Sequence, residues 1–401
     1  MKKFLVIGLI ILFWAGLAQS RPLTHKNVRT SKKVTSPAKR VKAPEVPEAS
    51  YQAYLVMDAR TGKVLEGENM RLKRAPASVV KLMVAYLVLE KLSRGEVKLS
   101  DPITITSEDS KIGGSQVYLK EGEKFTLEEL MKAVLVASAN DAACAVAEHI
   151  AGSREAFIQL MNQKAKALNM VDTEFHSVHG LPPAKGQQED LSSCADLAIL
   201  ARELLKFPKI LEWTAIKSEG FRNNQFIMNN HNKLLYRMPE MDGLKTGYYR
   251  ETGFNIVATA ARKDLRLIVV VLGSSRARTR DNVVLEKFKT SFARYKILDL
   301  VKKGEMINQE IFLKDGEPGK IKGLAGMDLS YSIPIDQKGI VTREVRVLNN
   351  LAGDVKQGQK LGELVVKVDN EPAGKVDILS PRFVPKAGWF RRMIRKVGLS
   401  S

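Results

Sequence analysis

Three short motifs, far apart in the chain, constrain its fold more than any other feature. They are Ser78-Val79-Val80-Lys81, Ser138-Ala139-Asn140 and Lys245-Thr246-Gly247. Each motif alone occurs by chance in many long proteins. All three in this order, with gaps of 60 and 107 residues between their first residues, are hard to obtain by accident. The order predicts a fold that brings two serines, two lysines and an amide into one site.

The first motif carries the chemistry of an activated nucleophile. A serine hydroxyl needs a base within hydrogen-bond reach, and Lys81 lies one helical turn from Ser78 on the same face. The run Val79 to Leu92 is apolar without Gly or Pro, which indicates a buried helix, and Pro76 suits its start. Burial and a second cation, Lys245, would lower the pKa of Lys81 and make it a neutral base.

Each motif also has a plainer interpretation. Ser78 and Lys81 could be an ordinary helix start with a lysine that reaches for solvent. Ser138 and Asn140 could be helix-capping residues, and Lys245-Thr246-Gly247 could be a strand near a turn. Only the joint occurrence favours an active site, since this motif set is typical of class A β-lactamases and penicillin-binding proteins.

The chain resembles a low-molecular-mass penicillin-binding protein, a serine-type D-alanyl-D-alanine carboxypeptidase of the peptidase S11 family. The resemblance covers about Ala49 to Tyr295 and continues more weakly beyond. Besides the three motifs, it rests on Ser138-Ala139-Asn140-Asp141-Ala142-Ala143, Phe175-His176-Ser177-Val178-His179-Gly180-Leu181, Ala195-Asp196-Leu197-Ala198, Asn230-His231-Asn232-Lys233-Leu234-Leu235 and Asp242-Gly243-Leu244-Lys245-Thr246-Gly247.

This resemblance implies a role for each site residue. Ser78 would attack the carbonyl of the penultimate D-alanine, Lys81 would be the base, and Ser138 would relay a proton to the leaving amine. Asn140 would hold a substrate amide and contact Lys81. The remaining residues would bind substrate. Lys245 and Thr246 would bind the terminal carboxylate, with Gly247 in the same motif, and the backbone N–H groups of Tyr248 and Ser78 would form the oxyanion hole. Arg280 would help to recognise the carboxylate, although Arg276 and Arg278 compete for this role.

The sequence departs from the family after the third motif. Tyr248-Tyr249-Arg250 replaces the small or polar residues often found there, so we expect a bulkier cleft edge. No metal or other cofactor is expected, because the histidines show no ligand spacing and a serine apparatus needs none. His179 is expected to make a structural hydrogen bond. Stem peptides of peptidoglycan and β-lactam antibiotics are the implied ligands.

The fold class follows from the resemblance and from the order of the patterns. We expect an α/β catalytic domain over residues 50–297, an antiparallel sheet with helices on both faces plus a helical subdomain. Strands are predicted at Tyr51 to Asp58, Phe254 to Ala261 and Leu265 to Leu272, and a closing helix at Val283 to Tyr295. Short alternating runs separated by Gly and Asp turns predict a small all-β domain over residues 298–381.

The two ends have a different character. Residues 1–20 read as a secretory signal peptide, with an uncleaved anchor as the alternative, and residues 21–49 as a basic disordered linker. Residues 386–401 predict a basic amphipathic helix on a membrane surface, because Trp389, Phe390, Met393, Ile394 and Val397 share one face. The expected location is therefore the extracytoplasmic face of the bacterial cytoplasmic membrane.

The net charge of +20 would be typical of a nucleic-acid-binding protein if the basic residues were spread over the folded domains, but most of the excess lies at the two ends of the chain. The ends before Tyr51 and after Ser380 hold 16 of the 64 basic residues but two of the 44 acidic ones, which leaves about +6 for the rest. We therefore expect no nucleic-acid partner. The two cysteines, Cys144 and Cys194, could be a disulfide or two buried thiols.

Three functions remain open on the residues alone. The first is removal of the terminal D-alanine from peptidoglycan pentapeptides, with D,D-endopeptidase action a close alternative. The second is a β-lactamase, but Glu174 has Val178 four residues on, where that family's loop has asparagine. The third is a non-catalytic wall-binding protein, which the intact motifs disfavour.

Overall fold

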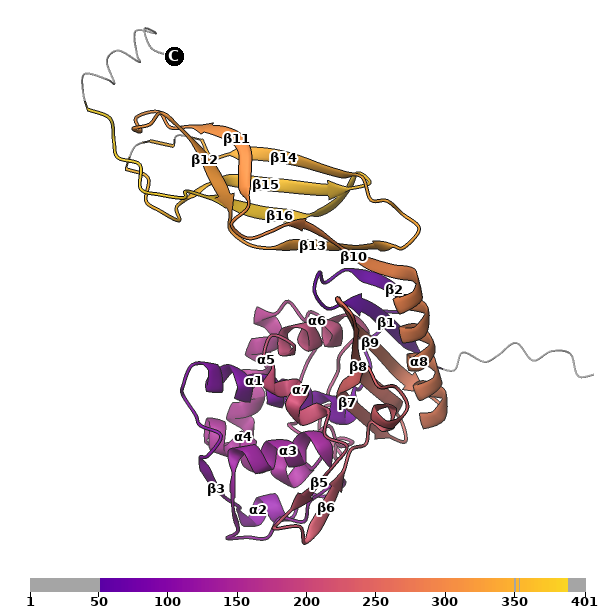
Figure 1. Ribbon diagram of the computed structural model, residues 1–401. Helices are drawn as coiled ribbons and strands as arrows, with labels where there is room; N and C mark the ends of the chain where they lie inside the picture. Colours follow the sequence, from indigo (N-terminus) through magenta and orange to yellow (C-terminus); the bar gives the residue numbers. More distant parts are fainter. Residues whose placement is uncertain (1–50, 350, 353, 389–401) are drawn as a thin grey trace, which may run out of the picture. The chain divides into compact units, whose positions relative to one another are not determined.

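The computed structural model describes residues 51–349, 351–352 and 354–388 (Figure 1). Its largest part is built on a five-stranded antiparallel sheet in the order β2-β1-β9-β8-β7. The strands are β1 (Ala53–Asp58), β2 (Val64–Glu68), β7 (Met241–Tyr249), β8 (Gly253–Arg262) and β9 (Leu265–Ser274). The sheet therefore pairs the start of this part with its end, and the chain between β2 and β7 is an insertion. The predicted strands are confirmed.

The insertion is mainly helical and includes two short strand pairs. Its elements are α1 (Lys81–Ser93), β3 (Pro102–Thr104), α2 (Ser107–Ser110), β4 (Lys124–Thr126), α3 (Leu127–Val136), α4 (Asn140–Ala151), α5 (Arg154–Ala167), α6 (Cys194–Leu204), α7 (Lys209–Thr214), β5 (Ser218–Phe221) and β6 (Phe226–Asn229), with 3₁₀ turns at Ala77–Val80 and Lys233–Tyr236. Every residue of α1 from Lys81 to Leu89 is buried. This explains its unbroken apolar run, because a helix surrounded by protein needs no polar face.

Helices cover both faces of the sheet, as expected (Figure 1). Along β9, Ile268, Val270 and Leu272 join the core that includes α1, α3, α4 and α6. The intervening residues Leu267, Val269 and Val271 face the core of α8 (Ala277–Arg294). This is the two-residue alternation of a strand buried on both sides.

The helix α8 begins six residues before the predicted closing helix, which was placed at Val283 to Tyr295. Its first turn contains Arg278 and Arg280 and no apolar residue larger than alanine. A helix predicted from the spacing of apolar residues therefore begins later in the sequence than the helix itself. The helix also ends one residue earlier, since Tyr295 belongs to a strand.

The C-terminal part is all β, as expected. Its strands are β10 (Tyr295–Val301), β11 (Met306–Phe312), β12 (Lys320–Ala325), β13 (Leu329–Pro334), β14 (Val341–Val347), β15 (Lys360–Val368) and β16 (Glu371–Leu379). Five of them form an antiparallel sheet in the order β11-β12-β16-β15-β14, and β10 pairs with β13. This part has a core of its own, with Leu361, Val366 and Ile378 fully buried.

Several predictions on the chain ends lie outside the described residues. These are the signal peptide of residues 1–20, the linker of residues 21–49 and the amphipathic helix from residue 389 on. The described start of that helix is not helical, because Lys386 pairs with Gly316 in an isolated β-bridge. Within the described residues, no helix is long and apolar enough to cross a membrane.

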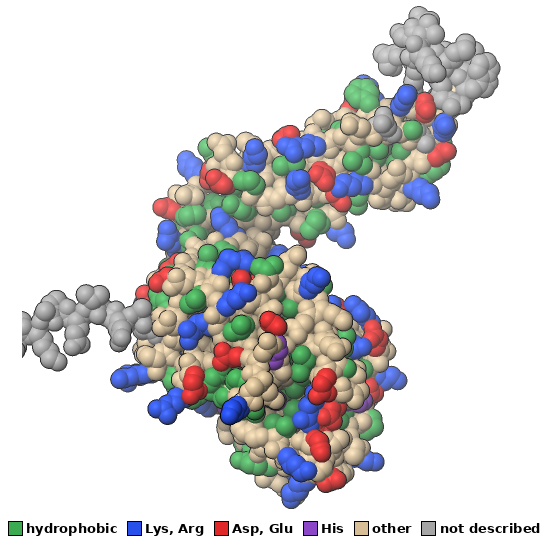
Figure 2. All heavy atoms as spheres, turned by 180° about the vertical axis from the view of Figure 1, so that it is seen from behind, with side chains coloured by type: hydrophobic (Ala, Val, Ile, Leu, Met, Phe, Trp, Pro, Cys, Tyr) green, Lys and Arg blue, Asp and Glu red, His purple; other side chains and the backbone are tan. Residues whose placement is uncertain are grey.

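The surface of the described part carries charges of both signs. Figure 2 shows lysine and arginine side chains interspersed with aspartate and glutamate over the visible face, with no continuous basic patch. Many of these charges form surface ion pairs, for example Arg262 with Glu240 and Lys360 with Asp377. A surface with both signs interspersed in this way does not by itself indicate a charged partner.

Candidate active site

Ser78 lies in a 3₁₀ turn directly before α1, and Lys81 is the first residue of that helix. The buried side chains of Val79 and Val80 anchor the turn in the core. Ala77 takes a left-handed φ of 50°, which costs free energy and projects the serine out of the turn. The Lys81 Nζ atom lies 3.0 Å from the Ser78 Oγ atom.

The Lys81 side chain is fully buried, so the interpretation of a lysine reaching for solvent is wrong. Its Nζ donates to Asn140 Oδ1 and to the carbonyl oxygen of His179, both at 2.7 Å. Burial lowers the pKa of Lys81 to about 7, although the charges of Asp190 and Asp141 act in the opposite direction. A neutral amine has two N–H groups and one lone pair. With two acceptors taking the N–H groups, the lone pair is free to accept the Ser78 proton.

The second lysine forms a parallel pair with the second serine. Lys245 Nζ lies 2.8 Å from Ser138 Oγ and 3.0 Å from the carbonyl oxygen of Thr246. Burial lowers the pKa of Lys245 well below its ordinary value, and the charges of Lys81 and Arg280 lower it further. Each motif serine thus contacts one buried lysine, and the two lysines lie close enough to influence each other.

Ser138 and Asn140 are not helix caps, so that alternative is also wrong. The residue at the N-cap of α4 is Ala139, and no side chain caps the helix. Ser138 itself has a φ of 59°, a conformation that side chains other than glycine and asparagine rarely adopt. The strained turn directs the serine to Lys245 and the asparagine to Lys81.

A loop after α5 completes the surroundings of Lys81. The carboxylate of Asp190, which is 5% exposed, accepts the backbone N–H groups of His176 (2.6 Å) and Ser177 (2.9 Å) and the Ser177 hydroxyl (2.6 Å). The loop so held presents the His179 carbonyl to Lys81. Gly180 follows with a φ of 75° directly against the Ala77 carbonyl, where a side chain has no space.

His179 makes the structural hydrogen bond that the sequence predicted. Its Nδ1 accepts the backbone N–H of Leu181 at 3.1 Å, so the ring is neutral at that nitrogen. Burial and the charge of Lys81 lower the pKa of His179 to about 4. The functional part of this residue is its backbone carbonyl, which sequence reasoning missed because a carbonyl has no residue signature.

The third motif lies on β7, the edge strand of the sheet, next to the 3₁₀ turn of Ser78. Gly247 packs against the Pro76 carbonyl and the Ser78 backbone nitrogen, so only glycine allows this approach. Thr246 is buried. Tyr248 is 53% exposed, and its ring stacks on Phe254 with centroids 4.1 Å apart. An aromatic pair with an exposed tyrosine at this strand end fits the expected bulky edge.

Arg280 lies in the first turns of α8 and is buried. Its guanidinium donates twice to Asp281 Oδ1, at 2.9 and 2.6 Å, and once to the carbonyl of Asn255 at 3.3 Å. Its charge acts on the pKa of Lys245, so it contributes positive potential to the site. Whether it contacts a substrate carboxylate stays a prediction.

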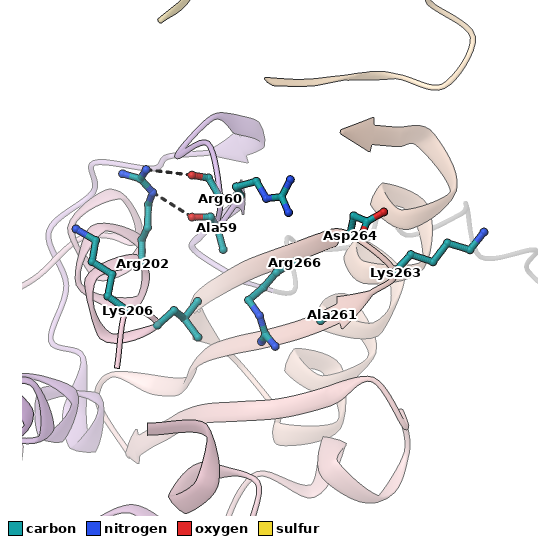
Figure 3. Close-up of a pocket in the computed structure, with 9 residues that line it drawn as sticks. Ala59, Arg60, Arg202, Lys206, Ala261, Lys263, Asp264 and Arg266 are labelled. Carbon is teal, nitrogen blue, oxygen red and sulfur yellow. Dashed lines mark hydrogen bonds between the residues drawn. The ribbon is translucent and has the colours of Figure 1, made fainter. Parts of the chain in front are cut away.

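Other features of the described residues do not form a second catalytic centre. No group of three His, Cys, Asp or Glu side chains in the described ranges is placed to hold a metal ion. Cys144 and Cys194 are buried free thiols. A cavity of about 500 Å³ opens beside the β8–β9 turn, lined by Arg60, Arg202, Lys206, Lys263 and Arg266 (Figure 3).

That cavity is lined by basic side chains, but its arginines are engaged in hydrogen bonds within the protein. Arg202 donates to the carbonyl oxygens of Ala59 and Arg60, as Figure 3 shows. Arg266 forms two hydrogen bonds to Asp242, at 2.9 and 2.8 Å. The lining contains no serine, cysteine or histidine, so the cavity is separate from the serine site.

The fold and the two lysine–serine pairs define an acylating serine hydrolase, and comparison with known proteins gives its family. The family model described as D-alanyl-D-alanine carboxypeptidase matches residues 39–276, and the model described as penicillin-binding protein 5, C-terminal domain, matches residues 295–386. The chain belongs to the D-alanyl-D-alanine carboxypeptidase family. It is a serine-type carboxypeptidase and a penicillin-binding protein.

Individual relatives agree over most of the chain. D-alanyl-D-alanine carboxypeptidase DacF of Bacillus subtilis is 34% identical over 354 residues, which cover 86% of this chain and 88% of the relative. The crystal structure of penicillin binding protein 5 from Haemophilus influenzae superposes with a TM-score of 0.75 at 27% identity, covering 85% and 99% of the two chains. Penicillin-binding protein D2 from Listeria monocytogenes, solved in its ampicillin-bound form, gives a TM-score of 0.55 at 29% identity, covering 61% and 97%.

Proposed function

We propose that Ser78 forms the acyl-enzyme through which this protein removes the terminal D-alanine from peptidoglycan pentapeptides. The observation that carries the proposal is the Lys81 amine, fully buried, 3.0 Å from Ser78 Oγ and with no carboxylate among its hydrogen-bond partners. A lysine in that environment loses its proton near neutral pH and can act as the general base.

The first half-reaction breaks the peptide bond. Lys81 accepts the Ser78 hydroxyl proton as Oγ bonds to the carbonyl carbon of the penultimate D-alanine. The backbone N–H groups of Ser78 and Tyr248 stabilise the oxyanion, a contribution of about a hundredfold to a thousandfold in rate. Ser138, held by Lys245, passes its proton to the leaving amine and takes up the proton that Lys81 had accepted. D-alanine then departs, and Lys81 and Ser138 are back in their starting protonation states.

The second half-reaction restores the enzyme. A water molecule gives its proton to Lys81 as its oxygen attacks the acyl carbon, and Ser78 Oγ leaves and takes that proton from Lys81. In the initial complex, before the peptide bond breaks, Asn140 holds the substrate amide, while Lys245 and Thr246 bind the terminal carboxylate that defines the substrate. Lysine and a hydroxyl are strong donors to such an anion, and Arg280 adds positive potential behind them.

The structure offers no support for a β-lactamase of class A type. The side chain of Glu174, the candidate for activating the deacylating water, is 62% exposed, and its carboxylate lies 3.2 Å from His176 Nε2. We therefore expect penicillin to acylate Ser78 and to leave slowly.

The test uses purified full-length protein, labelled penicillin and a pentapeptide ending in D-Ala-D-Ala. Wild type should form a stable adduct and release D-alanine, and Ser78→Ala should do neither. Ser93→Ala is the matched control, because Ser93 is an exposed serine at the far end of α1. An adduct of equal yield in Ser78→Ala would refute the assignment. Hydrolysis of a cross-linked peptide at the bond between D-alanine and the acceptor amine would indicate endopeptidase action in addition.

We further infer that the enzyme works outside the cytoplasm at the membrane surface. The support is the apolar leader of residues 1–20, the basic stretch of residues 21–49 and the amphipathic pattern of residues 386–401. Arginines opposite a Trp and Phe face favour anionic lipid headgroups. Flotation with vesicles of phosphatidylglycerol, but not of phosphatidylcholine, should recover the mature protein. Equal recovery after deletion of residues 388–401 would contradict the inference.

A further inference from the structure

The segment Gly113–Leu119 lies beside the catalytic asparagine and has neither helix nor strand structure. The Asn140 side chain donates through Nδ2 to the Gly113 carbonyl, and the Asn140 backbone N–H donates to the Ser115 carbonyl, both at 2.7 Å. The first of these bonds sets the orientation of the amide, because it turns Oδ1 toward Lys81. The position of the segment therefore decides whether Asn140 can hold the Lys81 amine.

A buried carboxylate holds the segment from the inner side. Asp141, which is 1% exposed, accepts the backbone N–H of Val117 at 3.2 Å and that of Leu119 at 3.0 Å. It follows Asn140 directly in α4, so the helix that carries the catalytic amide also carries this anchor. The N–H groups of the segment are thereby bound to the helix.

Two carbonyl groups of the same segment are bound by Arg222, which is more than a hundred residues away in sequence. Its guanidinium donates to the carbonyl oxygens of Val117 and Tyr118, both at 2.6 Å. It also forms two hydrogen bonds to Glu123, at 2.9 and 2.7 Å. All of the nitrogen positions of one arginine are thus used on one short stretch of chain.

The local structure around Arg222 holds its guanidinium in place. The side chain is 17% exposed and lies over the rings of Phe125 and Phe221, 5.5 and 5.2 Å from their centroids. Arg222 lies in the turn between β5 and β6 with a φ of 51°. A strained arginine over a stacked pair of aromatic rings is a costly way to anchor a surface turn, and the cost is understandable if the contact has another use.

We propose that Arg222 is a positioning residue for acylation: it fixes Gly113–Leu119 through two backbone carbonyls and so keeps the Asn140 amide on Lys81. The inference rests on the roles of Lys81 and Asn140 given above. Arg222 contacts neither Ser78 nor Lys81 and is not itself catalytic. Without it the segment loses its outer anchor and keeps the contacts to Asp141 and to the Asn140 backbone, so the Gly113 carbonyl has more freedom to move away from the Asn140 side chain.

Three variants of the full-length protein separate this role from a purely structural one. Arg222→Ala removes the contacts to the carbonyls and to Glu123. Glu123→Gln removes the ion pair but leaves both carbonyl contacts possible. Arg222→Lys keeps the charge, but a single amine cannot reproduce the planar, two-armed contact of guanidinium.

The measurements are the second-order rate of acylation by labelled penicillin, kcat and KM for D-alanine release, and the melting temperature. A displacement of about 1 Å near a reacting group can cost about a hundredfold in rate. We expect Arg222→Ala to acylate about ten to a hundred times more slowly, mainly through kcat, with Arg222→Lys intermediate and Glu123→Gln within about twofold of wild type.

The result that would overturn the proposal is a folded Arg222→Ala protein that acylates within about twofold of wild type. Equal losses in Arg222→Ala and Glu123→Gln, in proportion to their melting temperatures, would overturn it as well, since they would indicate stability alone. If Arg222→Ala does not fold, Arg222→Lys decides between the same outcomes. Failure of wild type itself to form a Ser78 adduct would instead refute the proposed function.

Discussion

The pH dependence of acylation follows directly from the environment of Lys81. Burial lowers the pKa of this lysine to about 7. With the ordinary lysine value of about 10.4, roughly one chain in 2500 would hold a neutral amine at pH 7, whereas a pKa of about 7 makes it about one in two. The structure thus gains about three orders of magnitude in available base before any chemistry occurs.

The expected profile has a definite sign and size. A group with a pKa of about 7 is neutral in about one chain in eleven at pH 6 and in about ten in eleven at pH 8. The second-order rate constant for acylation by labelled penicillin should therefore rise about tenfold between these values and level off above them. The rate is measured with penicillin in excess, and the melting temperature is followed over the same range so that unfolding is not mistaken for titration.

Two matched substitutions make the experiment decisive. Lys81→Arg keeps the positive charge but cannot lose its proton, so acylation should fall by about a hundredfold to ten-thousandfold at every pH. Lys91→Arg makes the same change near the other end of α1, where the side chain is paired with Glu96, and should leave the rate unchanged. A flat profile between pH 6 and 8, or substantial acylation of Lys81→Arg, would refute the reasoning.

Two further predictions concern space and burial. In Gly114→Ala the new Cβ would lie 2.6 Å from Asn140 Nδ2, so penicillin acylation should slow, whereas Gly95→Ala, with a similar positive φ but nothing within 4 Å, should only lower the melting temperature; equal acylation rates would contradict this. Cys144 and Cys194 should resist a charged thiol reagent in the native protein and react, two per chain, after unfolding, because both are buried and burial raises the pKa of Cys144 to about 12; rapid native labelling would show that one of them is accessible.

The sequence could predict the parts of the site that depend on side-chain type at short range. Ser78 and Lys81 are one turn apart at the start of an apolar helix. Their spacing and the apolar run that follows are enough to predict a buried base beside the serine. The paired strands β8 and β9 followed from two apolar runs around a two-residue turn at Lys263. In each case the neighbours along the chain are also the neighbours in space.

The parts that escaped prediction depend on backbone groups and on distant residues. Lys81 is held by the His179 carbonyl, and that carbonyl is placed by Asp190, which lies farther along the same loop, 13 residues from Ser177. Arg222 acts through two carbonyls of a segment that precedes it by more than a hundred residues. A carbonyl has the same chemistry in every residue, so the sequence carries no sign of which one will be used.

The two buried lysines suggest how the free enzyme prepares for an anionic substrate. Lys245 has no carboxylate among its hydrogen-bond partners, and burial and the charge of Lys81 both lower its pKa. A substrate carboxylate bound at Lys245 would supply the missing countercharge and raise its pKa, because an opposite charge favours the protonated form. The carboxylate and the charged Lys245 together carry no net charge, so the bound pair leaves the Lys81 amine without a new countercharge. The terminal carboxylate is thus recognised by one lysine, while the other stays a neutral base through its own burial.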